Sequence, residues 1–87
     1  MWERGDIVKS LAGRDKGYLL CVVGQDGDFV LVCDGKERKL ERPKKKNPKH
    51  LATVECEPFT WQLRGNHALR KALNKLKEDD SLCQNQI

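Results

Sequence analysis

The sequence has 87 residues, of which 34% are charged, and its formal net charge is +4 at pH 7. This length leaves no room for two full-sized domains, and the lack of any run of about 18 apolar residues excludes a transmembrane helix. The basic balance favours an anionic partner such as a nucleic acid.

The N-terminus and the cysteines indicate a reducing compartment. The first six residues lack the apolar core of a signal peptide, so we expect a cytoplasmic protein. The four cysteines are widely spaced and form no CxxC pair. A four-cysteine zinc site normally takes two ligands from one such pair, so we expect no metal and no cofactor. Cys21 and Cys33 fall inside apolar runs and are expected as small, reduced core residues.

Residues 1–57 have the pattern of one small β domain. Asp-Gly pairs at 26–27 and 34–35 predict tight turns, and a Pro-flanked basic loop follows at 43–48. Five short strands are expected, over residues 6–11, 18–24, 29–33, 37–41 and 51–56. Short strands with tight turns predict a small antiparallel barrel, with an open meander as the alternative.

The C-terminal extension, residues 58–80, is the expected cover for this β domain. The second and third strands are apolar on both faces, so their outer face needs a partner. After the alternating apolar run at 59–63, Asn66 has the character of a helix N-cap. The helix expected over about 66–78 carries one apolar stripe, formed by Leu69, Ala72, Leu73 and Leu76.

This stripe is expected to pack against the barrel, although it could also serve as a face for another protein. Asp79 and Asp80 place negative charge where a helix C-terminus disfavours it, so we expect the helix to end there. The remaining residues, 81–87, are predicted to form a disordered tail.

Positive charge is concentrated in residues 36–49. Eight lysines and arginines are opposed only by Glu37 and Glu41, so the net positive charge of this segment is larger than that of the whole chain. Such a patch suits a phosphate backbone, because binding strength grows with the number of phosphates neutralised. The alternative is a solvated loop that only keeps the protein soluble. We expect the segment to share one rim of the barrel with the loop that carries Arg14 and Lys16.

Residues 8–23, with Gly13 and Gly17 in their loop, resemble the KOW motif. The wider stretch 5–51 resembles the large-subunit ribosomal proteins of the "fourteen-e" type known from archaea and eukaryotes. The resemblance is carried by four ordered pieces, at residues 8–17, 20–23, 29–32 and 47–51. It implies an SH3-like barrel without enzymatic activity that binds structured RNA, such as ribosomal RNA, and a role in translation. With its C-terminal helix and short length, the chain is more similar to a small bacterial stand-alone KOW protein than to a full ribosomal protein. Two roles therefore stay open, a constitutive ribosomal component and an RNA-binding accessory factor.

The predicted RNA contacts combine the KOW-like loop with the basic segment. Gly13 and Gly17 are expected to shape the loop, since glycine suits backbone with positive φ. No catalytic residues are predicted, because neither His50 nor His67 has a nucleophile or carboxylate at a suitable spacing. The residues expected to contact RNA are Lys9, Arg14, Lys16, Lys36, Arg38, Lys39, Arg42, Lys44, Lys45, Lys46, Lys49 and His50.

Two other functions remain open. A protein-docking module could use the stripe from Trp61 to Leu76 to bind ribosomal or transcription proteins. Double-stranded DNA is disfavoured because the helix spends its apolar face on packing and does not resemble a recognition helix. Tyr18 and Phe29 lie in apolar strands and are expected in the core, which leaves few rings for stacking on bases. The sequence therefore favours folded RNA, recognised through phosphates and shape.

Overall fold

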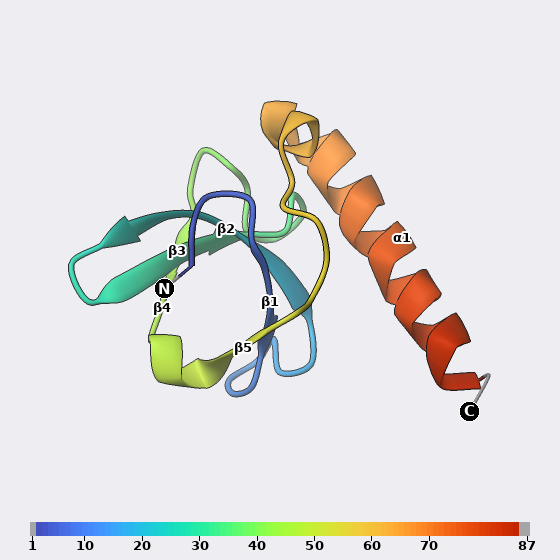
Figure 1. Cartoon of the computed structure of the whole chain (residues 1–87). Coiled ribbons are helices and arrows are strands. Elements are labelled where there is room, and N and C mark those ends of the chain that lie inside the picture. Colours follow the sequence, from blue (N-terminus) through green and yellow to red (C-terminus); the bar gives the residue numbers. More distant parts are fainter. Residues whose placement is uncertain (1, 86–87) are drawn as a thin grey trace.

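The computed structural model describes residues 2–85, with side chains to residue 78. Five antiparallel strands form one sheet, and a single α-helix follows them (Figure 1). The strands are β1 (Ile7–Ser10), β2 (Leu19–Asp26), β3 (Phe29–Cys33), β4 (Lys44–Lys46) and β5 (Leu51–Thr53). Two 3₁₀ turns, Pro48–His50 and Trp61–Arg64, precede β5 and the helix α1 (Asn66–Asn85).

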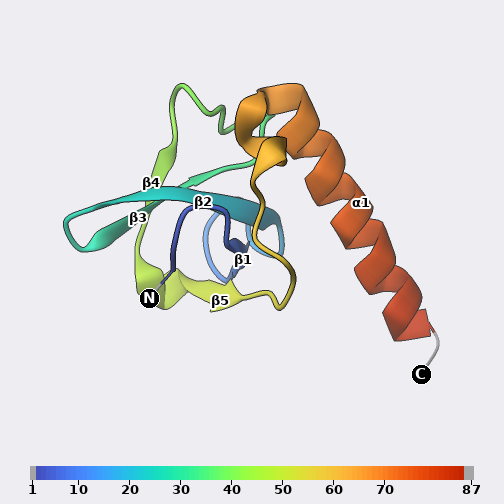
Figure 2. The same cartoon turned by 45° about the horizontal axis from the view of Figure 1, so that its top comes forward.

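The strand order is β4-β3-β2-β1-β5, so β4 and β5 are the two edges of the sheet. Among the described residues no pairing joins these edges, and the predicted barrel is therefore unclosed. The sheet is nevertheless strongly bent, and Figure 2 shows β1 and β5 lying under the β2–β3 hairpin. The predicted fold class is confirmed: the protein is mostly β, with antiparallel strands and a C-terminal helix packed against them.

The predicted fourth strand, residues 37–41, is wrong. Asp34 folds this stretch into a loop, because its Oδ1 accepts hydrogen bonds from the backbone N–H groups of Lys36 (2.8 Å) and Arg38 (2.9 Å). Local bonds of this kind compete with strand pairing. The fourth strand instead lies in the predicted basic loop, where Lys44–Lys46 pairs with Val30–Val32. Lysines suit this position because they protect an exposed sheet edge from pairing with other chains.

The sheet has two apolar faces, as the sequence predicts. The concave face holds one cluster of buried residues, formed by Val8, Leu20, Val22, Val30, Val32 and Leu51. The opposite face holds a second cluster, formed by Ile7, Cys21, Cys33, Phe59, Leu63, Leu69 and Leu73. Successive strand residues point to opposite faces, which is why Ile7 and Val8 belong to different clusters. The C-terminal extension and α1 therefore cover the outer face, and the predicted packing role of the helix stripe is confirmed (Figure 1).

Cys21 and Cys33 are buried and free, as expected, and they face each other across β2 and β3. Burial raises the pKa of the Cys21 thiol to about 12 and that of Cys33 to about 11. Both thiols are therefore protonated at neutral pH and act as small apolar side chains.

The helix begins at Asn66, but the predicted N-cap role of this residue is wrong. Its side chain accepts a hydrogen bond from the Leu40 N–H (2.7 Å) and donates one to Glu41 Oε1 (2.8 Å). Asn66 therefore ties the 34–42 loop to the start of α1. Gly35 allows this close approach, because its φ is +82° and a Cβ at this position would collide with the Asn66 carbonyl oxygen.

The helix runs to Asn85, well beyond the predicted end near residue 78. No glycine or proline occurs after Gly65 to stop it, and Asp79 and Asp80 alone do not. Part of the predicted tail, 81–87, is thus helical, and residues 86–87 lie outside the described residues. Of the helices described, none has the length and apolar character needed to cross a bilayer.

The expectation that Tyr18 and Phe29 lie in the core is also wrong. Tyr18 is 51% exposed and Phe29 is 45% exposed. Each ring stands at the end of a strand: Tyr18 directly precedes β2, and Phe29 is the first residue of β3. Neither cluster of buried residues extends that far.

Candidate nucleic-acid interface

A buried ion pair joins the two basic segments. The Lys46 ammonium lies 2.8 Å from Asp15 Oδ1, and both side chains are at most 10% exposed. The same ammonium donates to Ser10 Oγ (3.1 Å) and to the Ala12 carbonyl (3.0 Å), so its three N–H donors are all used. Ser10 Oγ donates in turn to Asp15 Oδ1 (2.9 Å).

Lys46 was predicted to contact RNA, and this prediction is wrong. Its ammonium is buried, and every donor is committed inside the protein, so none remains for a phosphate. Its side chain instead links the edge strand β4 to the end of β1 and to the loop that follows it. Backbone hydrogen bonds do not close the sheet, so this side-chain bridge is what connects β4 to the end of β1.

The Asp15 carboxyl is charged because of this arrangement. Burial raises its pKa, but hydrogen bonds from Lys46 and Ser10, together with the charges of Lys46 and Lys44, outweigh burial and lower the pKa below its ordinary value. The second oxygen, Oδ2, is buried and has no hydrogen-bond partner among the described residues. The charge of Asp15 is therefore balanced by Lys46 and is not available to neutralise Arg14 or Lys16.

The 11–17 loop has the shape predicted from its glycines. Gly13 and Gly17 both have φ of +88°. The loop is closed at its base by hydrogen bonds from Gly17 N–H to the Ser10 carbonyl (2.8 Å) and from Ser10 N–H to the Tyr18 carbonyl (3.0 Å). Arg14 and Lys16 are exposed on this loop. A backbone held by hydrogen bonds thus presents two exposed cations to solvent.

The two basic segments border a common hollow. We call it the loop hollow; it measures about 420 Å³ and is lined by Arg14, Asp15, Tyr18, Glu37 and Arg38. A second space, the helix hollow, measures about 260 Å³ and includes Tyr18, Asp34, Lys36, Glu37, Arg70, Asn74 and Lys77 in its lining. Tyr18 and Glu37 line both, so the two hollows adjoin. The expected proximity of the 14–16 loop to the start of the basic segment is therefore observed.

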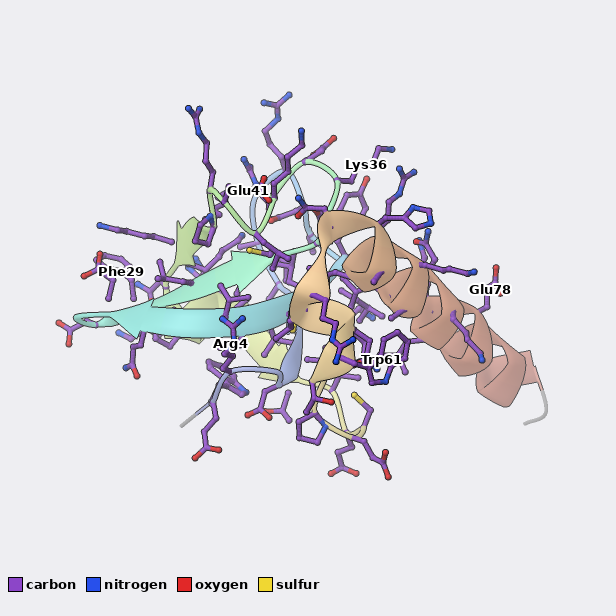
Figure 3. The ribbon with its side chains drawn as sticks, turned by 90° about the horizontal axis from the view of Figure 1, so that it is seen from above. Arg4, Phe29, Lys36, Glu41, Trp61 and Glu78 are labelled. Atoms are coloured by element: carbon purple, nitrogen blue, oxygen red, sulfur yellow. The ribbon has the colours of Figure 1, made fainter. Side chains whose placement is uncertain are left out.

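Cations outnumber anions around these hollows. Arg14, Lys36, Arg38, Arg70 and Lys77 line them, against the carboxylates of Asp34 and Glu37. Asp15 is excluded from this comparison because Lys46 balances it. Figure 3 shows Lys36 on the loop beside the first turns of α1, with Trp61 on the other side of the helix start. An excess of positive charge in a concave site favours anionic ligands.

The other predicted contact residues are spread over a wider surface. Lys45 is exposed and pairs with Asp26 at 2.8 Å, and Lys44 and Arg38 are half-buried. His50 is exposed, and its carbonyl accepts from the Leu11 N–H (2.8 Å), which brings the Pro48–His50 turn beside the start of the 11–17 loop. The remaining cations are exposed, namely Lys9, Lys39, Arg42 and Lys49.

Three residues of this site were missed in the sequence: Tyr18, Arg70 and Lys77. The Lys77 ammonium lies over the Tyr18 ring, 6.0 Å from its centroid, and Arg70 lines the same hollow. Arg70 and Lys77 are seven residues apart, close to two full helical turns, so both lie on one side of α1. This spacing was a usable signal, but nothing in the sequence indicates which loop that side of the helix meets.

Among the described residues, no group of three His, Cys, Asp or Glu side chains lies close enough to hold a metal ion.

Comparison of the sequence with protein-family models gives no match, and comparison with curated proteins gives no match either. The resemblance to KOW proteins therefore stays a prediction made from the residues themselves.

Replacing Lys46 by Met should destabilise the protein by about 3–5 kcal/mol, because it leaves the Asp15 carboxylate buried without its partner. Urea unfolding at pH 7 measures the change. The matched control is Lys45→Met, which breaks an exposed pair and should cost about 0–1 kcal/mol. The double variant Asp15→Asn/Lys46→Met should be more stable than Lys46→Met alone. Equal, small effects of the two lysine substitutions would show that the buried pair does not hold the fold.

Stability should also fall in acid through Asp15. Its folded-state pKa is lowered, so the ion pair contributes stability above the unfolded-state pKa and loses it as the pH falls through the folded value. Urea midpoints measured from about pH 6 to pH 3 should decline more steeply for the wild type than for Asp15→Asn. The other carboxyl groups titrate in both proteins, so the difference isolates Asp15. Parallel curves would contradict the lowered pKa.

Proposed function

We propose that this protein is a non-catalytic RNA-binding protein that contacts phosphates through the 11–17 loop and the basic segment at 36–49. The observation that carries the proposal is the pair of adjoining hollows, which cations from both segments and from α1 line. Phosphate contacts of this kind supply most of the affinity of nucleic-acid binding and position the ligand.

The resemblance to KOW proteins supports RNA as the ligand in preference to other polyanions. A KOW-type protein would take structured RNA, with ribosomal RNA as the leading candidate, and would work in the cytoplasm alongside the translation machinery. No enzymatic activity is proposed. Both histidines are exposed, and neither lines the two hollows.

The geometry disfavours the docking module as first formulated. Leu69 is fully buried and Leu73 is 5% exposed, so this half of the apolar stripe is occupied by the sheet and the 59–63 segment, whereas Ala72 and Leu76 are half-buried. The part of the stripe still open to a docking partner is the groove lined by Trp61, Ala72 and Leu76. Substitutions at Leu69 or Leu73 would unfold the protein before they reported on any partner.

Binding to a short RNA hairpin should weaken steeply with salt. If about five cations contact phosphates, the slope of log affinity against log salt concentration should be roughly −3 to −5. Arg14→Gln should reduce the magnitude of this slope by about 1 and weaken binding at low salt, because one phosphate contact is lost. Fluorescence anisotropy with labelled RNA between about 50 and 200 mM salt measures both quantities.

Lys71→Gln is the matched control. It removes the same charge from an exposed residue on α1 that does not line either hollow, so it should change the slope much less than Arg14→Gln. If Lys71→Gln weakens binding as much as Arg14→Gln does, the proposed surface is wrong. If the wild-type protein binds no RNA at low salt, the proposed function is wrong.

A further inference from the structure

We propose that the two hollows hold an unpaired nucleotide of the bound RNA, with its base stacked on the ring of Tyr18. This inference rests on the proposed function and narrows its ligand to RNA with a bulge, loop or end. It reverses the expectation from sequence that recognition proceeds through phosphates and shape alone. That expectation assumed a buried Tyr18, whereas the ring is 51% exposed.

The backbone of Tyr18 is fixed on both sides, which makes its ring a firm platform. Its N–H donates to the Asp15 carbonyl (2.9 Å), and its carbonyl accepts from the Ser10 N–H (3.0 Å). Asp15 is itself held by the Lys46 ion pair. Stacking of a base on this ring therefore needs no further ordering of the backbone, which lowers the entropy cost of binding.

One face of the ring is already occupied by a cation. The Lys77 ammonium lies 6.0 Å from the ring centroid, at the outer limit of a cation–π contact. Lysine has a long, flexible side chain and is exposed here, so a base can displace it at small cost. The displaced ammonium then stays within reach of the phosphate that accompanies the base.

The charges around the ring suit the phosphates on either side of one nucleotide. Lys36 and Arg70 line the helix hollow, and Arg14 and Arg38 line the loop hollow, with Tyr18 common to both. The loop hollow, about 420 Å³, is at the small end of ligand sites, which are commonly about 300–1,000 Å³, and the helix hollow, about 260 Å³, is slightly smaller than that range. Asn74 and Glu37 add an amide and a carboxylate for hydrogen bonds to a base edge.

An unpaired base is required because a base in a duplex has both faces covered by its neighbours. Of the other exposed rings, Phe29 lines a hollow with Asp6, Asp28 and Lys49, where the two carboxylates outnumber the one cation and disfavour phosphate. Trp61 is 61% exposed and is bordered by Lys71 and Lys75. Trp61 is therefore the matched control, because it tests whether any exposed ring with nearby cations would bind an unpaired base equally well.

The test compares two RNAs that differ only in an unpaired element. One is a perfect duplex, and the other is the same duplex with a three-nucleotide bulge. Anisotropy at one salt concentration gives the ratio of their affinities for the wild type, Tyr18→Leu, Tyr18→Phe and Trp61→Leu. Tyr18 is half exposed, so Tyr18→Leu should fold, and a thermal melt checks that it does.

The wild type should prefer the bulged RNA by about tenfold, since stacking of one base on an aromatic side chain is worth roughly that much. Tyr18→Leu should abolish the preference, so that it binds both RNAs with equal affinity, and Tyr18→Phe should keep it. Trp61→Leu should also keep it. A quenching of 2-aminopurine placed in the bulge, lost only in Tyr18→Leu, would report the stacked base directly.

Three results would overturn the inference while leaving RNA binding intact. These are equal affinity of the wild type for both RNAs, a preference that survives in Tyr18→Leu, and a preference lost in Trp61→Leu instead. In each case the effect of Arg14→Gln on the salt slope still tests the proposed function separately. Failure of the wild type to bind either RNA would overturn both proposals.

Discussion

The buried pair of Lys46 and Asp15 is the interaction on which the arrangement of this small protein depends. The sheet leaves β4 and β5 as unpaired edges, and Lys46 reaches from β4 to Ser10, Ala12 and Asp15. A buried ion pair is rarely a net source of stability, but the loss of one partner leaves a costly charge. The pair therefore fixes position: it sets the 11–17 loop against the basic segment and so brings their exposed cations to one side.

The helix contributes to the same surface through its packing. Leu69 and Leu73 bury their side chains against the outer face of the sheet, and this sets the rotation of α1 about its axis. Arg70 and Lys77 then border the helix hollow, while Asn66 and Gly35 hold the 34–42 loop against the start of the helix. Apolar packing on one side of α1 thus determines which cations stand beside Tyr18.

The parts of the fold that follow from local pattern could be predicted from the sequence. Asp-Gly turns and apolar runs located β2 and β3, and helical spacing located α1 and its buried stripe. The fourth strand was predicted in the wrong place, at 37–41, because the Asp34 carboxylate accepts hydrogen bonds from the backbone N–H groups of Lys36 and Arg38 and so folds this stretch into a loop. The burial of Lys46 could not be read from three consecutive lysines, since only pairing to β3 decides which of them faces inward. The exposure of Tyr18 could not be predicted, because an apolar run does not show how far α1 and the 59–63 segment extend over the sheet.

We propose one RNA-binding surface, formed by the 11–17 loop with Tyr18, the 34–42 loop and the side of α1 that bears Arg70 and Lys77. The most direct measurement is an NMR titration of the ¹⁵N-labelled protein with a short RNA hairpin at low salt. Amide shifts should change together in these three segments, with one common affinity. Changes confined to the surface around Trp61 and Lys71, or around Trp2 and Phe29, would contradict it.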